Sequence, residues 1–414
     1  MPKRSKQHFW KHILFAVVLN VFALMTQFFW GAFPLSKLAF PLHGYMFLLI
    51  ICVAIICCLI LNRSIVGRFF ASYQAAIVST VNISVWAIVL GLTAQISPSA
   101  HAHDWAGSIG LRQMTSFYPF VLAYIYLIVS LCFATIKRLK FGFSMKNLGF
   151  FFNHMGLLLT LYFTGAGAAD TKQYNMTVRE GQLEWRAINE ATGKATELPI
   201  AIKLQDFVME EYAPKLAIVH RGSGKVQPEE LPQYFNIDTL QPQGKLLDWK
   251  IEINEFFMNG IRANDSTYQE IPMPGACPAA FITAENVNTG EKLRSWISAG
   301  NNMQLYKFLA IGEKSDSLVI AMTQPEPKAF YSDVDIFLKS GESISNQRIE
   351  VNHPFAADHW MIYQSDYDKA LGTMSITSVF DLVFDPWRKY TIGSIIMLAI
   401  GSLFLFWRNK STIN

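Results

Sequence analysis

The class of this protein is set by the stretch KNLGFFFNHMGLLLTLYFTGAGAAD, residues 146–170. Apart from Asn153 and His154, residues 148–167 are apolar or small, and a helix of about 20 such residues crosses the hydrocarbon core of a bilayer. An imidazole at that depth is costly to insert, and such groups usually face a bundle interior, a cavity or a ligand. His154 is therefore the first candidate functional residue.

Three roles are open for His154. The imidazole could form a hydrogen bond with a neighbouring helix, which would be a purely structural role. It could also bind a metal or a haem iron, because neutral imidazole is a common iron ligand. A proton relay is the third possibility. The apolar residues near it in the sequence could contact either the face of a porphyrin or lipid. They are Phe150, Phe151, Phe152 and Leu157.

Composition indicates a membrane protein with a soluble part. Of the 414 residues, 51% are hydrophobic and only 16% are charged, and the charges concentrate between Asp170 and Lys389. Outside that block, six apolar runs approach the length of a membrane-spanning helix. They are residues 13–33, 45–61, 75–94, 117–135, 148–167 and 391–407. The first run is too long for a signal peptide and lacks a convincing small-residue cleavage site, so we expect a retained helix.

Basic residues near the ends of the runs predict the orientation. They gather before the first run, after the second, between the fourth and fifth, and after the sixth, and this positive-inside bias places both termini in the cytoplasm and residues 170–389 outside. The net charge of +4 adds nothing beyond this bias, and no nucleic-acid partner is indicated. The basic residues are Lys3, Arg4, Lys6, Lys11, Arg63, Arg68, Lys137, Arg138, Lys140, Lys146, Arg408 and Lys410.

The outer block is expected to be β structure. Five segments alternate apolar and polar residues or are rich in β-formers, and turn sequences such as RGSGK and NTGEK separate them. A block of about 220 residues can bury a core of its own, as one antiparallel sandwich or two smaller sheets. The segments are residues 201–212, 248–256, 279–287, 317–324 and 332–340.

Cysteine positions argue against a thiol–disulfide oxidoreductase. Four of the five cysteines lie in the apolar runs, which leaves Cys277 alone in the outer block. Such an enzyme needs two thiols on the same side of the membrane. Cys57 and Cys58 are expected to pack as small hydrophobic residues.

Further candidate residues lie in outer segments. His101 and His103 stand two apart in a short loop, where an extended chain would place both on one side toward a metal or the edge of a haem. A solvated turn is the alternative. Arg112 could pair with a haem propionate or anchor the interface. His353 and His359 flank a turn and could equally be surface residues.

The end of the block predicts a β hairpin that leads toward the last helix. The sequence VNHPFAADHWMIYQSDYD at 351–368 has an NHP turn and an aromatic strand, and DPW follows at 385–387. Together with NHMGLLLTLYFTGAG at 153–167, SFYPFVLAYIYLIVSLCFATIKRLKF at 116–141 and AIVLGLTAQ at 87–95, this pattern resembles the ResB (CcsB) family. The resemblance runs from about Ala75 to Trp407, and two N-terminal helices are additional to it.

The resemblance implies a function in cytochrome c biogenesis. ResB works with the membrane protein CcsA, and the pair delivers haem to apocytochrome c outside and supports its covalent attachment. The implied cofactor is haem b, as a transported substrate. His154 matches the family's intramembrane histidine, which is a proposed axial haem ligand. The implied location is the bacterial cytoplasmic membrane. The expected division is residues 1–74 with two extra helices, 75–169 with three core helices, the β domain 170–389, and the sixth helix with a cytoplasmic tail, 390–414.

Two other classes of function compete with haem delivery. A structural or chaperone subunit would hold apocytochrome or CcsA without binding haem, and the lack of a visible catalytic constellation motivates this alternative. Catalysis by this chain alone is therefore not expected. A solute transporter predicts ionisable groups in several membrane helices, whereas the sequence offers one such helix.

Overall fold

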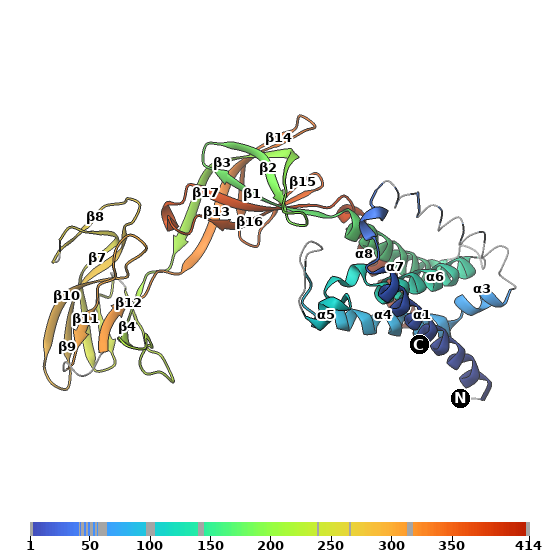
Figure 1. Cartoon of the computed structure of the whole chain (residues 1–414), viewed down its shortest axis with the longest axis horizontal. Helices are drawn as coiled ribbons and strands as arrows, with labels where there is room; N and C mark the ends of the chain where they lie inside the picture. Colours follow the sequence, from blue (N-terminus) through green and yellow to red (C-terminus); the bar gives the residue numbers. More distant parts are fainter. Residues whose placement is uncertain are drawn as a thin grey trace.

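The computed structural model describes residues 3–40, 64–96, 104–139, 145–237, 240–264, 266–312 and 318–410, with a few single positions between 42 and 56. A helical bundle lies at one end of the molecule, a β sheet follows it, and a second β module lies farthest from the bundle (Figure 1). Most of the second apolar run lies outside the described residues, as do Cys57, Cys58, His101 and His103.

Nine helical segments are described outside the region of the β strands, residues 172–384, and four regions among the described residues are long and apolar enough to cross a membrane: Phe9–Trp30, Tyr73–Leu92, Trp105–Lys137 and Arg388–Leu405. The protein is therefore a membrane protein, while the count of six spans stays a prediction. The helical segments are α1 (Lys3–Trp30), η1 (Leu35–Leu38), α3 (Ile65–Phe70), α4 (Tyr73–Leu92), α5 (Trp105–Ser108), η2 (Leu111–Ser116), α6 (Tyr118–Leu139), α7 (Met145–Asp170) and α8 (Arg388–Lys410).

The fifth apolar run forms α7, which packs along α8. Glycine permits this close approach, because a Cβ on Gly156 would lie 2.5 Å from the backbone nitrogen of Leu398. Two side-chain hydrogen bonds cross the same interface. Asn153 donates to Ser402 over 2.7 Å, and the hydroxyls of Thr160 and Ser394 lie 2.9 Å apart.

The sheet nearer the bundle, here called the proximal sheet, has eight antiparallel strands in the order β14-β13-β3-β2-β1-β17-β16-β15. Its inward side chains are mainly Ile, Val and Leu, as period-two alternation predicts. The edge strand β14 also contacts β15 and β16, so the sheet curls around one core. The strands are β1 (Lys172–Arg179), β2 (Leu183–Asn189), β3 (Ala195–Glu211), β13 (Pro327–Leu338), β14 (Ser343–Glu350), β15 (Phe355–Ala357), β16 (Trp360–Tyr367) and β17 (Thr377–Phe384); η3 (Gly372–Met374) precedes β17.

The distal module consists of two further sheets, ordered β10-β9-β7-β6, with β8 paired to β7, and β11-β12-β4-β5. One hydrophobic core lies between the two sheets, and it includes the buried side chains of Leu216, Ile251, Ile282, Ile297 and Ile320. The strands are β4 (Lys215–His220), β5 (Phe235–Asn236), β6 (Gln243–Leu246), β7 (Trp249–Arg262), β8 (Tyr268–Glu270), β9 (Cys277–Asn286), β10 (Lys292–Ser298), β11 (Leu309–Ile311) and β12 (Leu318–Met322).

Two details of the β prediction were wrong. The block contains three sheets rather than one sandwich or two sheets. The NHP turn at Asn352–Pro354 does not close a hairpin either, because β14 pairs with β13 and β15 pairs with β16 at the opposite edge of the sheet. The strand that pairs with the aromatic strand β16 and leads into α8 is β17.

Candidate functional site

His154 lies in the middle of α7 and is half-buried. Its ring stacks on Phe150 with the ring centroids 3.6 Å apart, and Nδ1 lies 3.0 Å from the Phe150 carbonyl oxygen. Because a carbonyl only accepts, a bond here places a hydrogen on Nδ1 and, in neutral imidazole, the lone pair on Nε2. The ring therefore has a defined orientation and one nitrogen suited to a metal.

The position of His154 around α7 can be compared with the residues that contact α8 and α6. Asn153 and Gly156 face α8, while Leu158 packs in a cluster with Leu131 and Cys132 of α6. With 100° between successive residues, His154 falls between these two faces. In angle it lies nearer to Leu158, which packs on α6, than to Asn153, which contacts α8.

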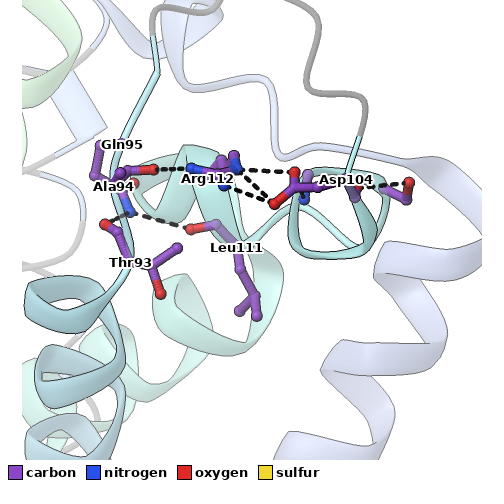
Figure 2. Close-up of polar contacts among 8 residues, drawn as sticks. Thr93, Ala94, Gln95, Asp104, Leu111 and Arg112 are labelled. Carbon is purple, nitrogen blue, oxygen red and sulfur yellow. Dashed lines mark hydrogen bonds and ion pairs between the residues drawn. The ribbon is translucent and has the colours of Figure 1, made fainter.

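Arg112 is engaged by the loop segments that carry Ala94 and Asp104. Its Nε and a terminal nitrogen donate to both carboxylate oxygens of Asp104, the shortest contact being 2.6 Å, and its other terminal nitrogen donates to the Ala94 carbonyl (Figure 2). The guanidinium of Arg112 lowers the pKa of Asp104 to about 2. Gln95 joins the same network by donating to the carbonyls of Thr93 and Leu111. A haem propionate would have to compete with Asp104 for Arg112.

The remaining predicted histidines do not form a common site in the described structure. His353 is exposed, with 80% of its side-chain surface accessible, and its nearest carboxylate is Glu350 at 4.0 Å. The described residues hold no group of three or more His, Cys, Asp or Glu side chains that could bind a metal ion.

A cavity with a volume of about 410 Å³ lies where the bundle meets the proximal sheet. Four chain segments that are distant in sequence form its wall, namely the end of the η1 loop, the α7–β1 junction, the start of β16 and the β17–α8 junction. They contribute Phe40, Asp170, Lys172, His359, Phe384 and Trp387, among others.

Asp170 and Trp387 hold this junction together. Asp170 is 7% exposed, and its carboxylate accepts from the backbone nitrogen of Phe40 at 2.7 Å and from Nε1 of Trp387 at 2.5 Å. Trp387 also stacks on Phe163 of α7 with the centroids 5.8 Å apart. A buried carboxylate is tolerated only when donors satisfy it, so these two bonds fix the arrangement of α7, the η1 loop and α8.

Sequence reasoning missed this cavity and one buried histidine. The sequence alone indicates His359 only as a residue beside a turn and Asp170 only as the start of the polar block. The signal available was an aspartate at the end of an apolar helix together with the DPW sequence before the next one. His12 lies just before the first apolar run, yet it is 4% exposed, stacks on Phe69 and contacts the Ser72 hydroxyl at 3.3 Å.

The fold and the site thus define a membrane protein whose helical bundle carries a large β domain. Residues 279–392 match the model of the ResB-like family, which confirms the resemblance over this segment. No curated protein matches the chain. The matched segment runs from β9 into the first turn of α8 and contains His359, Phe384 and Trp387 of the cavity wall. His154 and Arg112 lie outside the matched segment. The family match therefore does not test their roles, which rest on the local sequence around each residue. The family match supports a role in cytochrome c biogenesis.

Proposed function

We propose that this chain is the ResB-like subunit of a haem delivery complex in the bacterial cytoplasmic membrane, with both termini in the cytoplasm and the β domain outside. It receives haem within the membrane and supports covalent attachment of haem to apocytochrome c. The match of residues 279–392 to the ResB-like family carries this proposal. The bundle joined to an external β domain is consistent with it.

His154 is the residue that we propose binds the haem iron inside the membrane. The Nδ1 contact with Phe150 and the stacked ring restrain the imidazole, as the second contact of an iron-bound histidine usually does. Haem is the transported substrate here, not a resident cofactor. The histidine holds it, and Phe150 stacks on the imidazole and fixes the orientation of that ring.

The chain is proposed to act with a CcsA-like partner and with apocytochrome c. Thioether formation requires reduced haem iron and reduced substrate cysteines. Two cysteines in the described part of the chain, Cys132 and Cys277, are both buried, and the Cys277 thiol contacts the Ser298 hydroxyl at 3.3 Å. Buried thiols of this kind are poor redox reagents, so the reducing equivalents come from other proteins.

A scaffold function is the second candidate. Three apolar side chains at one end of the distal module are largely exposed, namely Met303, Leu305 and Tyr306 at 65%, 79% and 66%. Exposed apolar clusters of this kind often contact protein partners. In that case the distal module would hold apocytochrome or CcsA, and the chain would bind no haem.

Purification of the full chain from membranes separates the two functions. A haem subunit is expected to show a Soret band and about one or more haem equivalents per chain after detergent extraction, as a bound histidine-ligated iron requires. A scaffold would be colourless, yet it would still co-purify with a CcsA-like protein. Colourless chain from cells with ample haem and intact partner would contradict the haem proposal.

A further inference from the structure

We propose that the cavity between the bundle and the proximal sheet binds an anionic phospholipid from the adjacent leaflet, with the phosphate on Lys172 and the acyl chains along α8. The cavity lies where α7 continues into β1 and β17 continues into α8, at the boundary between the membrane helices and the β domain. The proposal goes beyond haem delivery, because the residues that carry it take no part in the proposed binding of haem by His154.

Basic side chains without a protein partner gather at this boundary. Lys172 lies in the cavity wall at the first position of β1. Its side chain is exposed and forms no ion pair with any described residue. The same holds for Arg388 and Lys389, which lie between the wall residues Trp387 and Tyr390. Cations collected beside one cavity favour an anionic ligand, and a lysine ammonium commonly binds phosphate.

The carboxylates of the junction form hydrogen bonds with other groups. The oxygens of Asp170 in the cavity wall accept from the backbone nitrogen of Phe40 and from Nε1 of Trp387. Asp385, just before α8, accepts from the backbone nitrogen of Trp387 at 2.9 Å. The ammonium of phosphatidylethanolamine would therefore meet cations rather than a free carboxylate. Phosphatidylglycerol, which carries a phosphate and no ammonium, fits the charges of the cavity better.

Aromatic side chains place the cavity at the level of lipid headgroups. Trp387 and Tyr390 lie in its wall, and tryptophan and tyrosine concentrate at the boundary between hydrocarbon and water. Phe40 adds a third ring to the wall and is 67% exposed. A phosphate bound at Lys172 would thus lie at the depth at which phospholipids carry theirs.

The apolar surface of α8 continues from the cavity into the membrane. Tyr390 is followed within the next two turns by the exposed side chains of Ile392, Ile395 and Ile396. They belong to the candidate membrane span Arg388–Leu405. Acyl chains of a lipid whose phosphate binds Lys172 can cover this surface, whereas a soluble phosphate would leave it bare. The continuity of the cation, the cavity and the apolar helix face favours a phospholipid over a soluble anion.

The test is thermal unfolding of the purified full chain, delipidated in detergent and titrated with short-chain phosphatidylglycerol or with phosphatidylcholine of the same chain length. We expect phosphatidylglycerol to raise the Tm in a saturable way and phosphatidylcholine to have little effect, because a ligand stabilises the state that binds it. Lys172→Gln should weaken phosphatidylglycerol binding about tenfold, since one charged contact is lost. Lys172→Arg keeps the charge and should keep most of the affinity.

Lys194→Gln is the matched control. Lys194 lies exposed in the turn between β2 and β3, outside the cavity wall, so the variant removes the same charge from the same sheet and should bind lipid as the wild type does. Equal affinity of Lys172→Gln and the wild type, or equal effects of the two lipids, would overturn the proposal.

Inorganic phosphate separates a lipid from a soluble anion. A rise in Tm with inorganic phosphate that matches phosphatidylglycerol and depends on Lys172 would assign the cavity to a soluble anion, and would overturn the proposal as well. The haem content of Lys172→Gln, measured on the same preparation, should equal that of the wild type. Failure of the lipid proposal would therefore leave the proposed function intact.

Discussion

Trp387 donates a hydrogen bond from its indole Nε1 to Oδ2 of Asp170 over 2.5 Å, and this bond ties the start of α8 to the last residue of α7. The two residues are 217 positions apart, with the whole β domain between them. The contact fixes how the β domain leaves the bundle and forms part of the cavity wall.

Trp387→Phe should destabilise this junction. The change keeps an aromatic ring but leaves the buried Asp170 carboxylate with one donor fewer, at a cost of about 1–3 kcal/mol. Thermal unfolding of the purified chain would register the loss as a lower Tm. Trp185→Phe is the control, because Trp185 lies exposed on β2. Equal Tm values for both variants and the wild type would show that the Trp387–Asp170 hydrogen bond does not contribute to stability.

Gly156→Ala should loosen the α7–α8 pair. The new methyl group would lie 2.5 Å from the Leu398 nitrogen, so the helices must move apart at a cost of roughly 1–3 kcal/mol. Gly167→Ala is a matched control on the same helix, because its nearest neighbours would be 3.9 Å away. Melting in detergent should fall for Gly156→Ala only. A Gly167→Ala variant that is equally destabilised would indicate a general helix effect rather than close packing.

The Asp104–Arg112 pair should be insensitive to pH in the physiological range. Since the pKa of Asp104 is lowered to about 2 from 3.8, the stabilisation is present above the unfolded value and is lost as the pH falls toward 2. The Tm difference between wild type and Asp104→Asn should therefore be the same at pH 5 and pH 8. A difference that changes between these two values would mean that another group controls the loop.

The two tyrosines of β16 should behave differently. The ring of Tyr367 packs on Phe207 and Phe330 with centroid distances of 5.6 Å and 5.1 Å, whereas Tyr363 is 38% exposed. Tyr367→Ala should destabilise the β domain by about 1–3 kcal/mol, because the ring is partly buried against the core. Tyr363→Ala should leave stability nearly unchanged, so only this variant can report on docking to a partner through cytochrome c maturation. Strong destabilisation by Tyr363→Ala would contradict the observed packing.

Reporter fusions would test the predicted orientation. After Lys140, a reporter that works only in the cytoplasm should be active. Near Gly290, a reporter that works only outside the membrane should be active, because basic residues concentrate on the cytoplasmic side. An external signal at Lys140 would overturn the six-span topology.

The membrane class and the β structure were predictable because each depends on a local sequence pattern. Long apolar runs indicate membrane helices, and alternating apolar residues indicate strands. The segment 201–212 overlaps β3, and 279–287 overlaps β9, since alternation of apolar residues reports directly on a half-buried strand. The pairing of the strands was not predictable in the same way. The turn at Asn352–Pro354 is local, but whether β14 pairs with β15 or with β13 depends on the core far along the chain.

The candidate site was predictable from the sequence only where a local pattern indicates a residue. His154 stands out because it interrupts an apolar run, whereas the cavity combines residues as distant as Phe40 and Tyr390. The sequence offers Arg112 as a propionate partner, but its ion pair with Asp104 depends on how the loops between α4 and α6 fold. Long-range contacts of this kind leave no periodic trace in a single sequence.

The most direct test of the haem assignment is the haem content of the purified His154→Ala variant, with wild type beside it. Since an apolar side chain inserts more easily than histidine, the variant should reach the membrane in normal amount. We expect loss of the haem held in the membrane part, and partial recovery of cytochrome c maturation when imidazole is added to occupy the vacant ligand position. Wild-type haem content and an unchanged spectrum in His154→Ala would contradict the account.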